Sequence, residues 1–367
     1  MPQTGSRMAD AGEIEQAARL LRAGRLVAFP TETVYGLGAN ALDADAVARI
    51  YAVKRRPTTS PLIVHVASIE MAQSLVENWP EIAETLARRF WPGPLTLVLT
   101  KSHVGQDAVV DIDENAAELR SIGRPDASAP TWNLSTIPDI VTANLPTVGL
   151  RMPAHPIALA LIRAAGVPLA APSANRFSQL SPTTADHVRR GLGDDVDYIL
   201  DGGPCSVGIE STVLSLIGTT VKTTVGATAG SQPILLRPGG ISRAEIESVL
   251  GAAFGPIATV ADPASGPHPA PGLHPRHYSP RTTLYLTTNG KLPDQGQGIY
   301  LQFHNPASRA GITIHQMPRS AADYAAALYE VLHQADAGSY DWIAIDLPPS
   351  APEWEAVRDR LKRAATK

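Results

Sequence analysis

A proline-rich stretch from Ala261 to Pro280 places the strongest limit on how this chain can fold. Proline offers no backbone donor to a helix or a sheet, so a segment rich in it favours an extended, semi-rigid path. The chain has 367 residues, of which 44% are hydrophobic and 18% charged, which is enough apolar material for two cores. We therefore predict two domains, at residues 8–252 and 282–367, with a linker at residues 253–281.

Charge and cysteine content exclude several classes of protein. Lysine and arginine number 31 against 35 acidic residues, a net charge of −4, so the chain lacks the overall positive field that sequence-independent nucleic-acid binding needs. The single cysteine, Cys205, can form neither an internal disulfide nor a cysteine-built metal site, and we predict a small buried filler. The longest apolar stretch, residues 157–171, is interrupted by Arg163 and Pro168, so we predict a cytoplasmic protein without a membrane segment.

Short apolar runs and helical patterns alternate irregularly through the first domain. Asp10 with Glu13, Asp43, and Thr183 with Asp186 stand where helix N-caps are expected. Strands are predicted at residues 26–29, 62–66, 95–99, 147–151, 169–171, 198–200 and 213–216. This alternation predicts a mixed α/β sheet rather than a strict series of βαβ units. A polar stretch at about residues 101–140 lacks a hydrophobic period and is expected to be a surface insertion.

The second domain has a more regular pattern. Strands are predicted at residues 283–286, 298–303, 312–315 and 342–346, with one helix from Ser320 and another over residues 351–365. Alternating strands and helices of these lengths predict a small doubly wound, Rossmann-like α/β domain.

Neither standard nucleotide-binding loop occurs in the sequence. There is no G-x-x-x-x-G-K-[ST] motif, and Gly36-Leu37-Gly38 lacks the third glycine of the dinucleotide fingerprint. Polar segments rich in proline and glycine instead follow the predicted strands, where side chains from separate turns can meet at one sheet edge. A loop is expected to begin at Pro30, in the first of these segments. The segments are Pro30–Gly38, Lys54–Pro57, Pro61–His65, Trp91–Thr96, Gly149–Pro153, Ala171–Asn175, Ser181–Thr184, Asp201–Pro204, Gly208–Thr212 and Arg237–Gly240.

Together and in this order, these segments resemble the YrdC superfamily and, within it, the long two-domain L-threonylcarbamoyladenylate synthases. The resemblance spans about residues 11–250, and the linker segment Pro271–Pro280 extends it. It implies a YrdC-like twisted mixed sheet and a nucleotidyltransferase that makes L-threonylcarbamoyl-AMP and pyrophosphate from L-threonine, bicarbonate and ATP. It also implies Mg²⁺ bound with the ATP, and a separate transferase complex that modifies the tRNA adenosine next to the anticodon.

The resemblance assigns roles to several cationic and polar side chains. Lys54 and Arg56 resemble the pair that contacts the ATP phosphates, although a Lys-Arg-Arg run at a helix end also complements the helix dipole. Arg151 could bind the threonine carboxylate through two parallel hydrogen bonds. The amino-acid end of the site would be shaped by Thr31, Thr33, Tyr35 and His65. His65 also lies in an apolar run, where a core histidine satisfied by the backbone is nearly as plausible.

The nucleotide side of the site is assigned in the same way. Ser173, Asn175 and Ser181 match positions that contact nucleotide in the family, although serine and asparagine are also common turn formers. Ser211 and Thr212 lie in a Gly-x-Glu-Ser-Thr segment that lines the family's cavity, and Arg237 is a further phosphate candidate. His277 and Tyr278 lie in the linker, which in the family folds over the site and gates ligand exchange.

The sequence departs from the family pattern in two places. The insertion at residues 101–140 is longer than usual, and His274-Pro275 replaces a basic residue followed by an aromatic one, which leaves the linker's gating role open. His268, His274 and His277 have no acidic partners nearby and are spaced by prolines, so we predict no protein-built metal site.

The composition opposes two alternative functions. An RNA-binding module with a YrdC-like fold and no adenylate chemistry is opposed by the net charge of −4 and by the 5% aromatic content. A carbamoyltransferase subdomain of the hydrogenase-maturation type would bring a zinc finger, which a single cysteine excludes. The preferred reaction needs no protein nucleophile, because N-carboxylated threonine can attack the α-phosphorus itself.

Overall fold

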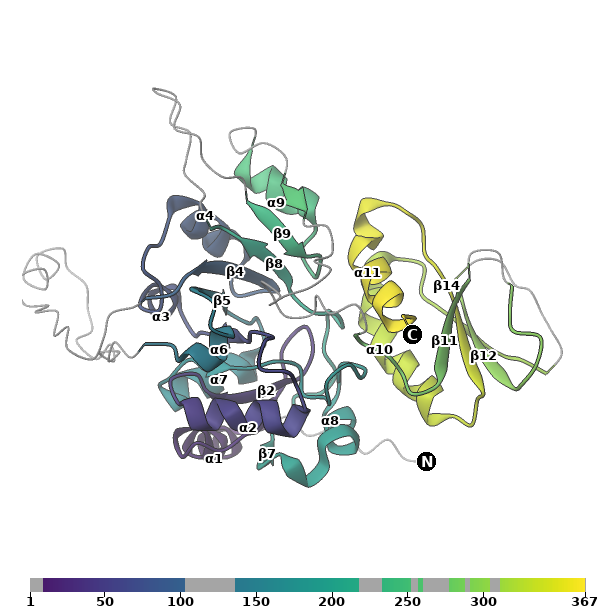
Figure 1. The fold of residues 1–367 in the computed structure, drawn as a ribbon, viewed down its shortest axis with the longest axis horizontal. Coiled ribbons are helices and arrows are strands. Elements are labelled where there is room, and N and C mark those ends of the chain that lie inside the picture. The colour runs from purple at the N-terminus through teal and green to yellow at the C-terminus, as the bar shows by residue number, and fades with distance from the viewer. Residues whose placement is uncertain are drawn as a thin grey trace, which may run out of the picture.

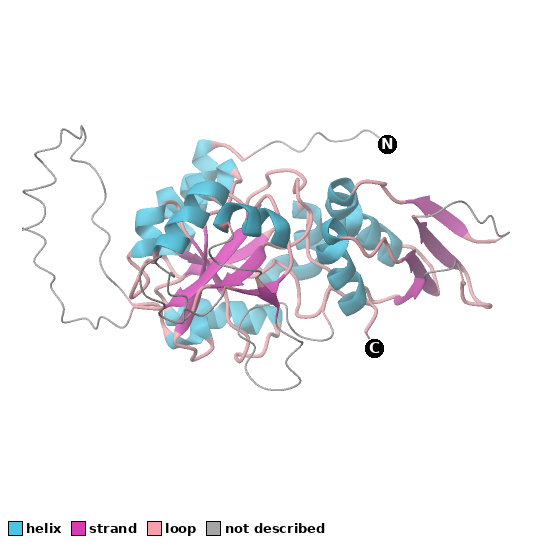
Figure 2. Ribbon diagram, turned by 90° about the horizontal axis from the view of Figure 1, so that it is seen from above, coloured by secondary structure: helices cyan, strands magenta, loops and turns pink. Residues whose placement is uncertain are grey.

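The computed structural model describes residues 9–102, 136–217, 233–251, 257–259, 277–287, 291–303 and 311–366. In this part of the chain a large mixed sheet and a smaller parallel sheet lie beside each other, with helices α10 (Ala321–Ala337) and α11 (Glu355–Ala364) between them (Figure 1, Figure 2). The mixed α/β class predicted from the sequence is confirmed.

The large sheet contains ten strands within the described residues. Their order is β10-β9-β8-β4-β5-β3-β6-β2-β1-β7, with both parallel and antiparallel neighbours. Helices lie on both faces of this sheet (Figure 2). The strands are β1 (Val27–Phe29), β2 (Gly36–Asn40), β3 (Ile63–His65), β4 (Leu95–Thr100), β5 (Thr147–Arg151), β6 (Leu169–Ala170), β7 (Tyr198–Ile199), β8 (Thr212–Ser215), β9 (Ile234–Arg237) and β10 (Ala258–Thr259).

Two helices of this part begin at the N-caps predicted from the sequence. Asp10 and Glu13 form a capping box on α1, and the Asp43 side chain accepts from the first turn of α2. The helices are α1 (Ala11–Arg22), α2 (Ala44–Lys54), α3 (Ile69–Gln73), α4 (Glu81–Phe90), α6 (Asp139–Thr142), α7 (Pro156–Ala165), α8 (Ala185–Leu192), the 3₁₀ turn η2 (Gly193–Asp195) and α9 (Arg243–Leu250).

Two expectations about local structure were wrong. The N-cap of α8 is Thr184 rather than Thr183, because the hydroxyl and amide of Thr183 pair with Nδ1 of His187. The segment after Pro30 is not loop throughout, since β2 forms from Gly36-Leu37-Gly38-Ala39-Asn40. A Cβ at Gly38 would lie 2.7 Å from the Phe29 ring, so glycine lets β2 pair closely with β1 at a position of weak strand propensity.

The small sheet is parallel throughout, in the order β11-β14-β12-β13. Its strands are β11 (Thr283–Thr287), β12 (Gly298–Gln302), β13 (Thr313–Gln316) and β14 (Trp342–Asp346), and the short turn η4 (Pro352–Trp354) precedes α11. This order confirms a second, C-terminal α/β domain built on a parallel sheet. Both α10 and α11 lie on the face of the sheet that is turned toward the N-terminal domain (Figure 1).

The two domains share part of a core. The C-terminal hydrophobic cluster takes in Val34, Leu180 and Ile209 from the N-terminal domain. Gly208 has a φ of +75°, and a Cβ there would lie 2.4 Å from the Ala325 carbonyl oxygen, so this glycine permits a close approach of α10. The contact surface between the domains therefore includes the segment that carries the Gly-x-Glu-Ser-Thr motif.

The predicted insertion and linker are described only at their ends. Residues 103–135 and 260–276 lie outside the described residues, and so do 252–256, so the domain boundaries stay a prediction. At the end of the insertion, α6 packs inward, where the Ile140 carbonyl accepts from the Tyr51 hydroxyl at 2.9 Å. At the end of the linker, the Ser279 amide donates to the Ser178 carbonyl at 2.8 Å.

Candidate functional site

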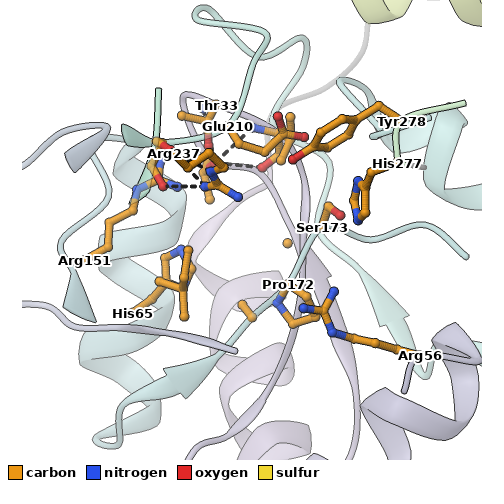
Figure 3. Close-up of a pocket in the computed structure, with 16 residues that line it drawn as sticks. Thr33, Arg56, His65, Arg151, Pro172, Ser173, Glu210, Arg237, His277 and Tyr278 are labelled. Atoms are coloured by element: carbon orange, nitrogen blue, oxygen red, sulfur yellow. Dashed lines mark hydrogen bonds between the residues drawn. The ribbon is translucent and has the colours of Figure 1, made fainter. Parts of the chain in front are cut away.

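A polar cavity lies where the predicted segments converge, and Figure 3 shows its labelled side chains around one common space. It is lined by Thr31, Thr33, Val34, Gly36, Arg56, Ile63, His65, Arg151, Ala171, Pro172, Ser173, Glu210, Ser211, Arg237, His277 and Tyr278. Ten of the fifteen predicted site residues are in this lining: Thr31, Thr33, Arg56, His65, Arg151, Ser173, Ser211, Arg237 and the linker pair His277 and Tyr278.

The linker pair closes one side of this cavity. The rings of His277 and Tyr278 lie 4.1 Å apart, and Phe177 packs edge-on against His277 at 5.7 Å. Burial, with the charges of Arg56 and Lys54 next in effect, holds the pKa of His277 well below its usual range, so this ring is neutral. Tyr278 has a φ of +62°, a left-handed conformation that turns the chain as it enters the site.

The loop after β1, which carries Thr31 and Thr33, is held by internal hydrogen bonds. The Thr31 and Thr33 hydroxyls lie 2.8 Å apart, and Oγ1 of Thr31 donates to the Val34 carbonyl at 2.7 Å. Tyr35 does not line the cavity, because its hydroxyl points to Gly203, donating to the carbonyl at 2.8 Å and accepting from the Gly202 amide. Tyr35 therefore ties this loop to a neighbouring one rather than facing a ligand.

Strand pairing brings His65 and Arg151 together. They are partners in the parallel register of β3 and β5, which places both side chains at the same end of the sheet. Burial, reinforced by the Arg151 charge, lowers the pKa of His65 to about 3, so the ring is neutral. Nη2 of Arg151 donates to Oε1 of Glu32 at 2.7 Å, and its Nε is buried with no hydrogen-bond partner among the described residues.

Glu32 is a residue that the sequence analysis missed. Its second carboxylate oxygen accepts from the Ala154 amide at 3.0 Å, so the carboxylate fixes Arg151 against the next loop. Glu32 belongs to the Pro30–Gly38 segment noted in the sequence, but nothing in the sequence showed which cationic side chain it would pair with.

The Lys-Arg-Arg run divides at the end of α2. Arg56 lines the cavity, and its guanidinium donates to the Ser60 hydroxyl at 2.6 Å and the Pro61 carbonyl at 3.1 Å. Burial lowers the pKa of Arg56 to about 10, which leaves it charged at neutral pH. Lys54 lies outside the lining. Its amine donates to the Ser173 and Asn175 carbonyls at 2.5 Å each, so the structure gives it a supporting position beneath the Ser-Ala-Asn turn.

That turn presents only one of its two predicted side chains to the cavity. Ser173 lines the cavity, whereas the Asn175 amide group donates to the Arg176 and Gln179 carbonyls at 2.9 and 2.8 Å. Ser181 lies outside the lining as well, with its hydroxyl donating to Oε1 of Glu210 at 2.6 Å. Asn175 therefore stabilises the turn itself, as the turn-forming alternative anticipated, whereas Ser181 orients Glu210.

The Glu-Ser-Thr segment supplies the opposite wall (Figure 3). Arg237 donates to the Ser211 carbonyl from Nη2 at 2.8 Å and to the Ser211 hydroxyl at 3.1 Å. Thr212 is outside the lining and pairs with the backbone of Ile241. Glu210 lines the cavity and was not predicted, although its motif was noted, because a carboxylate is an unexpected neighbour for a phosphate.

The charges around the cavity favour an anionic ligand. Arg56, Arg151 and Arg237 line it together with one carboxylate, Glu210. No hydroxyl in the lining is paired with a charged base, and Cys205 is buried outside the lining with a thiol pKa raised by burial. The described side chains can therefore bind and orient a phosphate-bearing substrate, and they offer no activated nucleophile.

Within the described residues, no group of three or more histidine, cysteine, aspartate or glutamate side chains converges to hold a metal ion. No helix in the same residues is long and apolar enough to cross a membrane.

Comparisons with known proteins give one consistent result. A family profile described as "Telomere recombination" matches residues 19–124 and 109–225, and one described as "Threonylcarbamoyl-AMP synthase, C-terminal domain" matches residues 241–366. The chain is 39% identical over 371 residues to the threonylcarbamoyl-AMP synthase of Bacillus subtilis, covering 96% of this chain and 93% of the relative. The corresponding Pyrococcus abyssi protein is 36% identical over 370 residues, covering 96% and 94%.

A solved structure extends the similarity to the whole fold. The crystal structure of P. abyssi Sua5 complexed with L-threonine superimposes with a TM-score of 0.78 at 34% identity, covering 98% of this chain and 96% of that one. Both domains and the linker end are therefore shared.

Proposed function

This chain belongs to the family of two-domain threonylcarbamoyl-AMP synthases, and we propose on that premise that it makes L-threonylcarbamoyl-AMP and pyrophosphate from L-threonine, bicarbonate and ATP. The observation that carries the proposal is the cavity itself, in which Arg56, Arg151 and Arg237 converge around polar side chains. The alternative of an RNA-binding module without adenylate chemistry has no support in these similarities.

The proposed reaction begins with threonine. Its neutral amine attacks the carbon of bicarbonate, and the carbamate forms with loss of one water; attack on CO₂ derived from bicarbonate instead releases one proton from the amine nitrogen. Arg151 would bind the threonine carboxylate; in support, Glu32 holds its guanidinium and the Arg151 Nε has no hydrogen-bond partner among the described residues. Neutral His65 beside it adds no second charge that would attract a phosphate to the amino-acid end.

The carbamate oxygen then attacks the α-phosphorus of ATP. An O–P bond forms, the bond from the α-phosphorus to the bridging oxygen breaks, and pyrophosphate leaves with its electron pair. Arg56 and Arg237 are the cations that would stabilise the charge developing on the phosphates. This assigns the chain to the nucleotidyltransferases, with catalysis by positioning and electrostatics.

Magnesium would enter this site with the nucleotide. Glu210 is the one carboxylate in the described lining, and it already accepts from Ser181 and Arg360, so the protein offers no carboxylate cage of its own. Phosphate oxygens would supply the coordination, and no step is assigned here to a protein-bound metal.

The product fits a cytoplasmic pathway of tRNA modification. We propose that a separate transferase complex takes the threonylcarbamoyl group to the adenosine next to the anticodon, and that this chain itself makes no strong direct contact with nucleic acid, in keeping with its net charge of −4.

The test is substrate omission with the purified full-length protein. Pyrophosphate release from ATP should require both threonine and bicarbonate, and mass spectrometry should detect threonylcarbamoyl-AMP in the complete reaction. Serine in place of threonine is the matched control for recognition of the amino acid. Release of pyrophosphate at the same rate without threonine would reject the proposal.

A further inference from the structure

The buried side chain of Arg360 joins the C-terminal domain to the cavity wall. Arg360 belongs to α11 and is 0% exposed. Its Nε donates to Oε2 of Glu210 at 2.7 Å, and its Nη2 donates to the Pro238 carbonyl at 2.9 Å. Its guanidinium also lies 5.1 Å from the centre of the Tyr278 ring. One side chain of the second domain thus contacts three segments of the site.

A second residue of the same domain binds the same carboxylate. The Tyr329 hydroxyl, on α10, donates to Glu210, lying 3.1 Å from Oε2 and 3.3 Å from Oε1. With Ser181 at 2.6 Å, Glu210 accepts from three donors, two of which come from the C-terminal domain. The orientation of this cavity-lining carboxylate therefore depends on both domains.

The charge of Glu210 depends on the same contacts. Burial alone would raise its pKa, but the charges of Arg360 and Arg237 and the hydrogen bonds from Ser181 and Arg360 hold the pKa below its ordinary value. The titratable groups around Glu210 are Arg360, Arg237, Tyr329 and Tyr278, with Asp359 behind Arg360. Without Arg360, the negative charge of Glu210 would be less well neutralised, and it would repel the phosphates that the cavity is suited to bind.

The backbone that follows Glu210 leaves little room for adjustment. A Cβ at Gly239 would lie 2.3 Å from the Thr212 nitrogen, so the strand end packs directly against this segment. Arg237 holds Ser211 from the other side. A movement of the Glu210 side chain would therefore displace the cavity wall, because the tightly packed backbone cannot relax around it.

We infer that the C-terminal domain completes the catalytic cavity through Arg360, which neutralises Glu210 and, together with Tyr329, fixes that carboxylate in the cavity wall. The inference rests on the proposed function. Arg360 and Tyr329 are positioning residues, because they act on substrate through Glu210. With Glu210 neutralised by Arg360, the lining keeps a net positive charge through Arg56, Arg151 and Arg237, which suits anionic substrates.

The decisive test is a double-mutant cycle of Arg360→Met and Glu210→Gln, read out as threonine-dependent pyrophosphate release. Arg360→Met should raise the KM for ATP roughly tenfold, the effect of one unit charge about 10 Å from the phosphates at an effective dielectric constant of about 20. The rise should shrink as the pH falls, because a Glu210 that has lost Arg360 binds a proton more readily and then carries no charge. Adding Glu210→Gln should restore most of the affinity and abolish this pH dependence.

Two matched controls separate this role from a structural one. Lys362→Met removes an exposed cation from the same helix and should leave the KM for ATP unchanged. Tyr329→Phe should lower kcat/KM about 3- to 10-fold by removing one donor. Tyr324→Phe, on the same helix, should not, because the Tyr324 hydroxyl is buried without a hydrogen-bond partner among the described residues.

Each outcome bears on a separate claim. An Arg360→Met enzyme with the wild-type KM for ATP, or a double variant no better than the single one, would overturn the inference. If Arg360→Met does not fold, an unchanged kcat/KM in Tyr329→Phe would overturn it instead. Failure of the proposed function would be recognised separately, as a wild-type protein whose pyrophosphate release ignores threonine.

Discussion

Replacing Lys54 by methionine tests whether this lysine supports the Ser-Ala-Asn turn or contacts phosphate. Its amine lies 2.5 Å from each of the Ser173 and Asn175 carbonyls, and its side chain is 1% exposed. Each bond from a charged donor contributes about 1.5–3 kcal/mol, and the cost of burying the ammonium offsets part of the sum. Burial, followed by the charges of Arg56 and Arg176, accordingly holds the pKa of Lys54 well below its usual range.

We therefore expect Lys54→Met to lower the free energy of unfolding by about 2–4 kcal/mol. ATP affinity should fall only indirectly, as the turn that carries Ser173 loosens. Urea denaturation followed by circular dichroism gives the first quantity, and calorimetric titration with ATP gives the second.

The control is Lys101→Met, which removes a buried lysine that pairs with Asp139 away from the cavity lining. It should destabilise the fold and leave ATP binding intact. An unchanged free energy of unfolding in Lys54→Met, together with a loss of ATP binding of more than a hundredfold, would refute the supporting role. That result would instead support the phosphate contact that the resemblance implied for Lys54.

Three further predictions follow from single side chains. Arg56→Met should weaken ATP binding about 10- to 100-fold by calorimetry, since one charged contact is lost; equal affinity would remove its phosphate role. The neutral state of buried His65, with its pKa of about 3 against an ordinary 6.5, means that the unfolded chain binds a proton first as the pH falls. Stability should therefore drop below pH 6.5, and the drop between pH 7 and pH 5, measured as urea midpoints, should be smaller in His65→Asn. Cys205→Ala should keep kcat within about twofold, because the thiol lies outside the cavity lining and burial raises its pKa; a large loss of activity would show that the thiol takes part.

Local signals in the sequence predicted much of the fold. The Asp10 capping box, the Asp43 cap and strand β14 lie where the pattern indicates. These features depend on residues a few positions apart, which the sequence displays directly. Strand β2 was missed because its pairing with β1 and β6, rather than its glycine-rich composition, makes it a strand.

The same division holds for the site. The motifs indicated a cavity with Arg56, Arg151 and Arg237, and the structure places these three in one lining. The sequence could not predict which cationic side chain faces the cavity and which one bonds to the protein, because neighbouring residues at a helix end point in different directions. Lys54 turns to backbone carbonyls, while Arg56, two residues on, faces the cavity.

The sequence by itself determined the family, the two-part organisation and the residue types that the chemistry needs. Only the tertiary structure decided the pairings of Arg151 with Glu32 and of Arg360 with Glu210, whose members are 119 and 150 residues apart. The physical reason is that a buried charge takes its partner from whatever the packing of distant segments brings within hydrogen-bond distance. No local pattern encodes that neighbour.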